Sequence, residues 1–94
     1  MQLVVDVGNT ETVVGLVDGR TDLKAHWRLS TPVPRTVDEY RHLLQALLGE
    51  KAATRLSAAV VGSVVPETTA VLQPTLAALV DGPVHVVGPD SRLP

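Results

Sequence analysis

The chain has 94 residues, of which 45% are hydrophobic, enough for a single core in one domain or in part of a larger one. Its net charge of −2, from 8 basic and 10 acidic residues, excludes nucleic acids and anionic membranes as expected partners. Because it has no cysteine and no apolar run of the ~20 residues that a membrane span needs, we expect a cytoplasmic protein without disulfides.

The first two strands are predicted at residues 2–7 and 11–17. Both segments are rich in apolar and β-branched residues, and the turn formers Gly8, Asn9 and Thr10 lie between them. This pattern predicts a β-hairpin with a polar tip.

A third strand is predicted at residues 23–30, after a turn that contains the dipeptide Asp18-Gly19. Apolar and polar residues alternate along it, which is typical of a half-buried strand that ends before Pro32. The residues expected on its buried face are Leu23, Ala25, Trp27 and Leu29.

The clearest helix is predicted to begin at Thr36, which forms a capping-box pattern with Glu39, and to end at Gly49. Its apolar positions are Tyr40, Leu43, Leu44, Leu47 and Leu48. Burial of this face should contribute more to the stability of the helix than the cap does.

The second half of the chain begins with a polar connection at residues 50–56 and an apolar run at 58–65. This run lacks alternation and therefore predicts a central strand that is covered on both faces. Pro66 suits the first turn of a second helix, in which Pro74 predicts a kink or a division into two short pieces. A short last strand is predicted at 84–87.

The tip of the hairpin has groups that could hold a phosphate. Gly8 lacks a Cβ and allows close approach of an anion, and residues near positive φ could point successive N–H groups at it. Thr10 and Thr12 add hydroxyl donors. Because the carboxylate of Asp6 would repel a phosphate, we expect Mg²⁺ between them. Alternatively, the segment is a tight turn that binds nothing, and Asp6 is a surface residue.

Other candidate residues carry weaker predictions. Ser63 lacks the surroundings of a catalytic nucleophile and is expected to shape the turn after its strand, near the site. Arg28 and Arg35 could balance phosphate charge, although solvation is the ordinary role of such side chains. The histidines lie far apart in sequence and are expected on the surface: His26, His42 and His85.

The segment Asp6-Val7-Gly8-Asn9-Thr10, with the apolar residues that follow it, resembles the first phosphate-binding motif of type III pantothenate kinases. These enzymes belong to the superfamily of acetate and sugar kinases, Hsp70 and actin. Segments 26–31, 35–40 and 63–66 agree with the same family in the same order, so the resemblance covers almost all of the chain.

This resemblance implies an α/β fold of the ribonuclease-H-like (actin-like ATPase) type. The expected order of elements is β-β-β-α-β-α-β, with a mixed sheet and helices. Residues 1–94 would then form an amino-terminal nucleotide-phosphate-binding domain, incomplete without a second domain.

The resemblance also implies an activity, namely ATP-dependent phosphorylation of pantothenate in coenzyme A biosynthesis. Asp6 would bind Mg²⁺ or another divalent cation. The implied cofactors further include a monovalent cation such as K⁺, and the implied assembly is a homodimer. The residues that would hold the nucleotide phosphates are Asp6, Val7, Gly8, Asn9, Thr10, Glu11, Thr12 and Val13.

The general base of the family lies in a Gly-x-Asp-Arg motif that these 94 residues do not contain, so we expect it downstream of Pro94. The resemblance thus implies no catalytic residue in this chain and no activity from it alone. Glu11 is a variation on the family pattern, and its carboxylate would disturb phosphate binding unless it points away.

Two other functional classes are compatible with parts of this pattern. A nuclease of the same fold would need a carboxylate on the central strand, and residues 58–65 contain none. A non-enzymatic relative that binds a nucleotide or a protein in a regulatory role stays open as the alternative.

Overall fold

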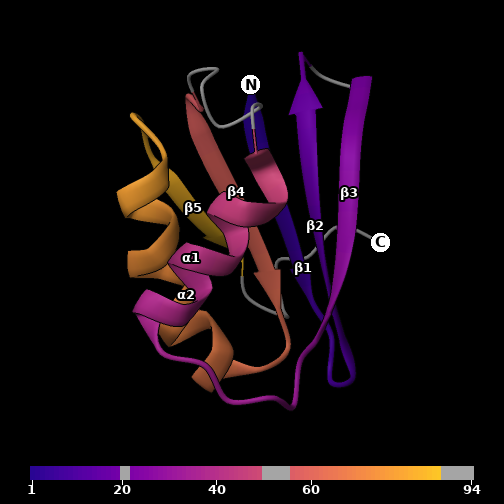
Figure 1. The fold of residues 1–94 in the computed structure, drawn as a ribbon, viewed down its shortest axis with the longest axis vertical. Coiled ribbons are helices and arrows are strands. Elements are labelled where there is room, and N and C mark those ends of the chain that lie inside the picture. The colour runs from indigo at the N-terminus through magenta and orange to yellow at the C-terminus, as the bar shows by residue number, and fades with distance from the viewer. Residues whose placement is uncertain (20–21, 50–55, 88–94) are drawn as a thin grey trace.

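The computed structural model describes residues 1–19, 22–49 and 56–87. They form a mixed α/β structure in which five strands make one sheet, in the order β3-β2-β1-β4-β5 (Figure 1). β1 pairs antiparallel with β2 and parallel with β4. The elements are β1 (Gln2–Val7), β2 (Glu11–Asp18), β3 (Asp22–Ser30), α1 (Val37–Leu48), β4 (Ala58–Ser63), α2 (Pro66–Leu79) and β5 (Val84–Val87).

Two predictions concern parts of the chain outside these ranges. The polar connection at 50–56 lies outside the described residues except for its last position. Pro94, downstream of which the general base of the family is expected, also lies outside them. The position of the general base therefore stays a prediction.

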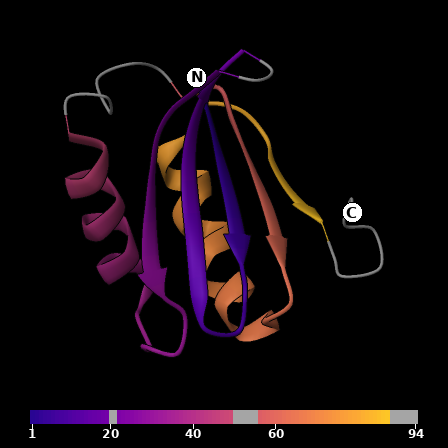
Figure 2. The same cartoon turned by 90° about the vertical axis from the view of Figure 1, so that its right-hand side faces the viewer.

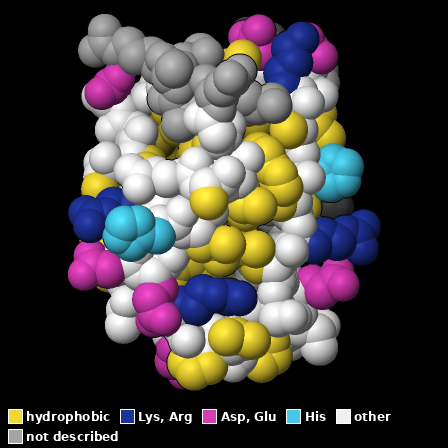
Figure 3. Space-filling view, in the orientation of Figure 1, with side chains coloured by type: hydrophobic (Ala, Val, Ile, Leu, Met, Phe, Trp, Pro, Cys, Tyr) yellow, Lys and Arg dark blue, Asp and Glu magenta, His cyan; other side chains and the backbone are white. Residues whose placement is uncertain are grey.

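Both helices lie on the same face of the sheet, as the two perpendicular views show (Figures 1 and 2). On β1 every second residue is buried beneath them, namely Leu3, Val5 and Val7. Seen from the helix side, hydrophobic side chains gather along the middle and most of the charged ones lie at the margins (Figure 3). The remaining buried core residues include Val14, Leu16, Tyr40, Leu44, Leu48, Ala59, Val61, Leu72 and Leu76.

The opposite face of the sheet is not covered by either helix. Val4 is 40% exposed there. The expectation that the strand at 58–65 is covered on both faces is wrong. In β4, fully buried residues alternate with half-buried ones because α1 and α2 pack against the same side.

The predicted position of Leu23 is also wrong. The pairing of β2 with β3 shifts by one residue, so that Leu16 lies opposite Ala25 while Val17 lies opposite Leu23. Lys24 is the additional residue of this β-bulge, which reverses the alternation of side chains. Leu23 therefore lies on the uncovered face and is 54% exposed, while Ala25, Trp27 and Leu29 pack against the core as expected.

The capping box of α1 is confirmed. The Glu39 N–H donates to the Thr36 hydroxyl at 3.2 Å, and the Thr36 N–H donates to the Glu39 carboxylate at 2.9 Å. Gly49 ends the helix with a φ of 53°, a conformation that a side chain would strain. Tyr40 and Leu44 are buried beneath the helix.

α2 begins at Pro66 as predicted and runs unbroken through Pro74. Of the two alternatives expected there, the division into two short pieces is wrong, and the kink stays a prediction. The carbonyl that loses its intrahelical partner at Pro74 belongs to Ala70, an exposed residue that water can reach. At the next residue, the Thr75 hydroxyl donates to the Val71 carbonyl at 2.7 Å. Neither described helix is long and apolar enough to cross a membrane.

A buried pair of hydroxyl groups fixes the end of β3 beside the first hairpin. The Thr12 and Thr31 hydroxyls lie 2.8 Å apart, and both residues are buried. The Thr31 N–H also donates to the Thr10 carbonyl at 3.0 Å. The hairpin tip is therefore held through both the backbone and the side chain of Thr31.

Replacement of core and cap residues should separate the two sources of helix stability. We expect Leu44→Ala to lower the free energy of unfolding by about 2–5 kcal/mol, because it leaves a cavity. We expect Thr36→Ala to lower it by about 1 kcal/mol. Urea denaturation followed by circular dichroism measures both, and an equal loss in the two variants would contradict this ranking.

The hydroxyl pair predicts non-additive mutations. Thr12→Val removes one hydroxyl without changing the shape of the side chain and leaves that of Thr31 without its partner, so it should cost about 1–3 kcal/mol. The double variant, Thr12→Val with Thr31→Val, should cost less than the sum of the single variants. Strict additivity in the same denaturation experiment would show that the two hydroxyls do not depend on each other.

Candidate functional site

The hairpin tip and the turn between β4 and α2 lie at the same edge of the sheet (Figure 1). They meet there because β1 and β4 run parallel, with Val7 opposite Ser63. The Val64 N–H donates to the Val7 carbonyl at 3.1 Å, which joins the two segments directly. This edge holds the carboxyl ends of both strands, the usual place for ligands of α/β sheets.

The tip itself, residues 8–10, is closed by a hydrogen bond of 2.9 Å from the Gly8 N–H to the Glu11 carbonyl. The expected positive φ angles are absent, because Gly19 and Gly49 alone have positive φ among the described residues. Gly8 is instead needed for space, since a Cβ there would lie 3.1 Å from the Glu11 carbonyl oxygen. A small residue at this position therefore keeps the turn tight.

Asp6 is exposed and lies on the uncovered face of the sheet, close to the tip. It lines a shallow apolar hollow of about 330 Å³ with Val4, Val13 and Leu23. Among the described residues, no three histidine, aspartate or glutamate side chains converge on one point. A hard cation at Asp6 would therefore take its other ligands from water or phosphate oxygens, which is the coordination that Mg²⁺ favours.

The other residues predicted to hold phosphate differ in how far they are buried. Asn9 and Thr10 are exposed at the tip, whereas Val7 and Thr12 are fully buried. The Thr12 hydroxyl, expected to be a donor at the tip, faces the helix side of the sheet and pairs with Thr31. Only the main chain of the buried residues can therefore take part in an interaction at the surface.

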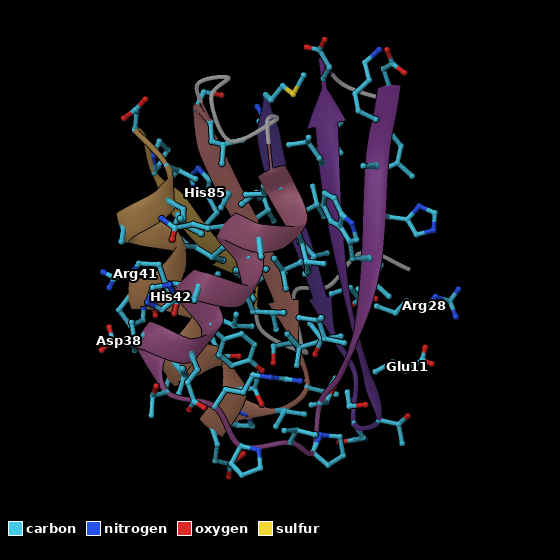
Figure 4. All side chains as sticks on the ribbon, viewed as in Figure 1. Glu11, Arg28, Asp38, Arg41, His42 and His85 are labelled. Atoms are coloured by element: carbon cyan, nitrogen blue, oxygen red, sulfur yellow. The ribbon has the colours of Figure 1, made fainter. Side chains whose placement is uncertain are left out.

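Glu11 is neutralised by a neighbour on β3. Its carboxylate lies 3.4 Å from the guanidinium of Arg28, and both side chains are exposed (Figure 4). Strand pairing places Glu11 on the same face as Asp6. An exposed ion pair adds little stability, but it reduces the repulsion that Glu11 would exert on a nearby anion.

Ser63 shapes the turn after β4, as predicted. Its hydroxyl accepts a hydrogen bond of 2.9 Å from the Val65 N–H and donates one of 3.0 Å to the Val65 carbonyl. The side chain is buried, so its role is to hold the first turn of α2 beside the hairpin tip. The three histidines are exposed as expected, with His42 on α1 and His85 on β5 (Figure 4).

Arg35 has a more defined place than the sequence indicated. It donates to the Ser30 carbonyl at 3.1 Å, and its guanidinium carbon lies 5.3 Å from the centre of the Tyr40 ring. It lines a second hollow, of about 340 Å³, on the helix side of the tip together with Asn9 and Glu67. The available sequence signal was its position directly before Thr36, the N-cap of a helix.

Comparison with known proteins gives the family. The sequence model of the family "Type III pantothenate kinase" matches residues 2–94. A protein of that name from Syntrophotalea carbinolica is 45% identical over 91 residues, which cover 95% of this chain and 35% of the relative. Another from Anaeromyxobacter sp. (strain K) is 41% identical over 94 residues, covering 98% and 37%, respectively.

A third relative, from Streptomyces avermitilis, is 57% identical over 49 residues, which cover 52% of this chain and 18% of the relative. It too is named type III pantothenate kinase. The first two relatives match almost the whole of this chain, but the chain spans only 35% and 37% of their own length. With a family match over residues 2–94, the chain belongs to the type III pantothenate kinase family.

Proposed function

We propose that this chain is the amino-terminal part of an ATP-dependent kinase that phosphorylates pantothenate, a reaction of coenzyme A biosynthesis. The observation that carries the proposal is the exposed carboxylate of Asp6 beside the open hairpin tip, in a chain of this family. A regulatory relative without activity has less support, because the relatives that cover most of this chain are named as kinases.

In this proposal Asp6 holds a divalent cation, directly or through water. Such a cation, when bound, neutralises charge on the nucleotide phosphates. The chain itself orients the phosphates through the exposed side chains of Asn9 and Thr10 and through the main chain of residues 6–13. The Arg28–Glu11 pair keeps the approach to this face close to neutral.

The finer assignments are also proposals. The order of strands and helices supports a ribonuclease-H-like domain over residues 1–94, in which a second domain would complete the nucleotide and pantothenate sites. The resemblance to the family supports a homodimer, a monovalent cation such as K⁺ and a cytoplasmic location. The proton acceptor for the pantothenate hydroxyl would come from the Gly-x-Asp-Arg motif that the family pattern puts downstream of Pro94.

Titration of the ¹⁵N-labelled chain with ADP tests the metal role of Asp6. With Mg²⁺ present, we expect the amide resonances of residues 6–13 to shift, and we expect EDTA to remove most of the shift. Asp6→Asn should weaken the Mg²⁺-dependent binding by at least about tenfold, because a neutral amide is a poor ligand for a hard cation.

Asp18→Asn is the matched control, because Asp18 is an exposed carboxylate at the opposite end of the hairpin. It should bind Mg²⁺ and ADP as the unmodified chain does. Unchanged metal-dependent binding in Asp6→Asn would remove Asp6 from the site.

A chimera tests the activity itself. The 94-residue sequence replaces the matched segment of the Syntrophotalea carbinolica relative, and pantothenate-dependent release of ADP is measured. We expect the chimera to be active and its Asp6→Asn variant to lose at least about 100-fold in rate, as for removal of one charge-stabilising group. An Asp6→Asn chimera with full activity would contradict the proposed role.

A further inference from the structure

The hollow on the helix side of the hairpin tip is distinct from the hollow at Asp6. It has a volume of about 340 Å³, enough for a small organic molecule. The segment after β3 and the start of α2 form its apolar walls, with Pro32, Val33, Val65 and Val71. Asn9 is the residue of the hairpin tip that lines it, whereas Asp6 lines the hollow on the other face.

Arg35 is the positively charged residue among those that line this hollow. Its guanidinium is held by the Ser30 carbonyl and by the face of Tyr40, whose side chain is only 2% exposed. A guanidinium has five N–H donors. Among the described residues one hydrogen bond from Arg35 is found, to Ser30, so its remaining donors are available to a ligand.

The other polar groups of the hollow are mostly neutral, with Thr68 and Asn9 at its sides. The exception is Glu67, which also lines the hollow, but none of the salt bridges found among the described residues joins it to Arg35. An anion is therefore attracted by a fixed guanidinium and opposed by a carboxylate that is not paired with it. The apolar walls favour a ligand with a hydrocarbon body.

We propose that this hollow is a binding site for a compact organic anion, with its carboxylate or phosphate on Arg35 and its apolar part against the proline and valine side chains. This hollow and the hollow at Asp6 lie on opposite faces of the sheet, although Asn9, which lines the first, is also among the residues proposed to orient the nucleotide phosphates. The anion site needs neither a metal nor a nucleotide, so its test does not depend on the proposed kinase activity.

The ¹⁵N-labelled chain is titrated in EDTA with three probes of similar shape: isovalerate, isopentyl phosphate and isovaleramide. We expect amide shifts at Thr31, Arg35 and Thr68 with a charged probe and much weaker binding of the neutral amide. The stronger of the two charged probes identifies the carboxylate or the phosphate as the preferred group. Equal binding of the amide and the anions would overturn the proposal.

Two variants with opposite effects make the test specific. Arg35→Gln should raise the dissociation constant of the preferred anion at least about tenfold, and Glu67→Gln should lower it, because it removes the opposing charge. Arg41→Gln is the matched control, since Arg41 lies on α1 beside Asp38 and outside the hollow (Figure 4); it should leave the constant unchanged.

The folding of each variant is checked by the dispersion of its amide spectrum. Arg35→Lys retains the charge and should keep more affinity than Arg35→Gln. If Arg35→Gln does not fold, Glu67→Gln decides alone, and an unchanged dissociation constant in that variant overturns the proposal. An unchanged dissociation constant in a folded Arg35→Gln variant also overturns the proposal.

Discussion

Hydrogen bonds between the parallel strands β1 and β4 bring together the two segments on which the site depends. Val7 lies opposite Ser63, and the Val64 N–H binds the Val7 carbonyl. The hairpin tip and the first turn of α2 therefore share one edge of the sheet, although most of the chain separates them in sequence. The Ser63 hydroxyl binds the Val65 N–H at the start of α2, and the Thr31 N–H binds the Thr10 carbonyl of the hairpin tip. Without the parallel pair, the hollow on the helix side would lose one of its walls.

One-sided packing of the helices gives the two sides of the tip different chemistry. On the uncovered face, Asp6 stands at the surface, where water and phosphate oxygens can complete the shell of a cation. On the helix side, the segment after β3 and the start of α2 provide apolar walls, and the guanidinium of Arg35 comes from the residues just before α1. One hairpin can thus face a cation on one side and an anion on the other.

The sequence predicted those features that depend on neighbouring residues. The tip at Gly8 and the capping box of Thr36 follow from local turn and helix chemistry, and both are present. The exposure of Leu23 follows from a bulge in the pairing of two strands, and no residue type marks a bulge of this kind. The placement of Arg35 over Tyr40 depends on how α1 packs, which periodicity does not specify.

The bulge at Lys24 also affects how β3 meets other molecules. β3 is an edge strand, and the backbone groups along its outer side could serve as a template for a strand from another chain. The shift in pairing at Lys24 interrupts that row, and the charged side chains of Lys24 and Arg28 are exposed along the same strand. Both features make the outer side of β3 a poor template for strand addition.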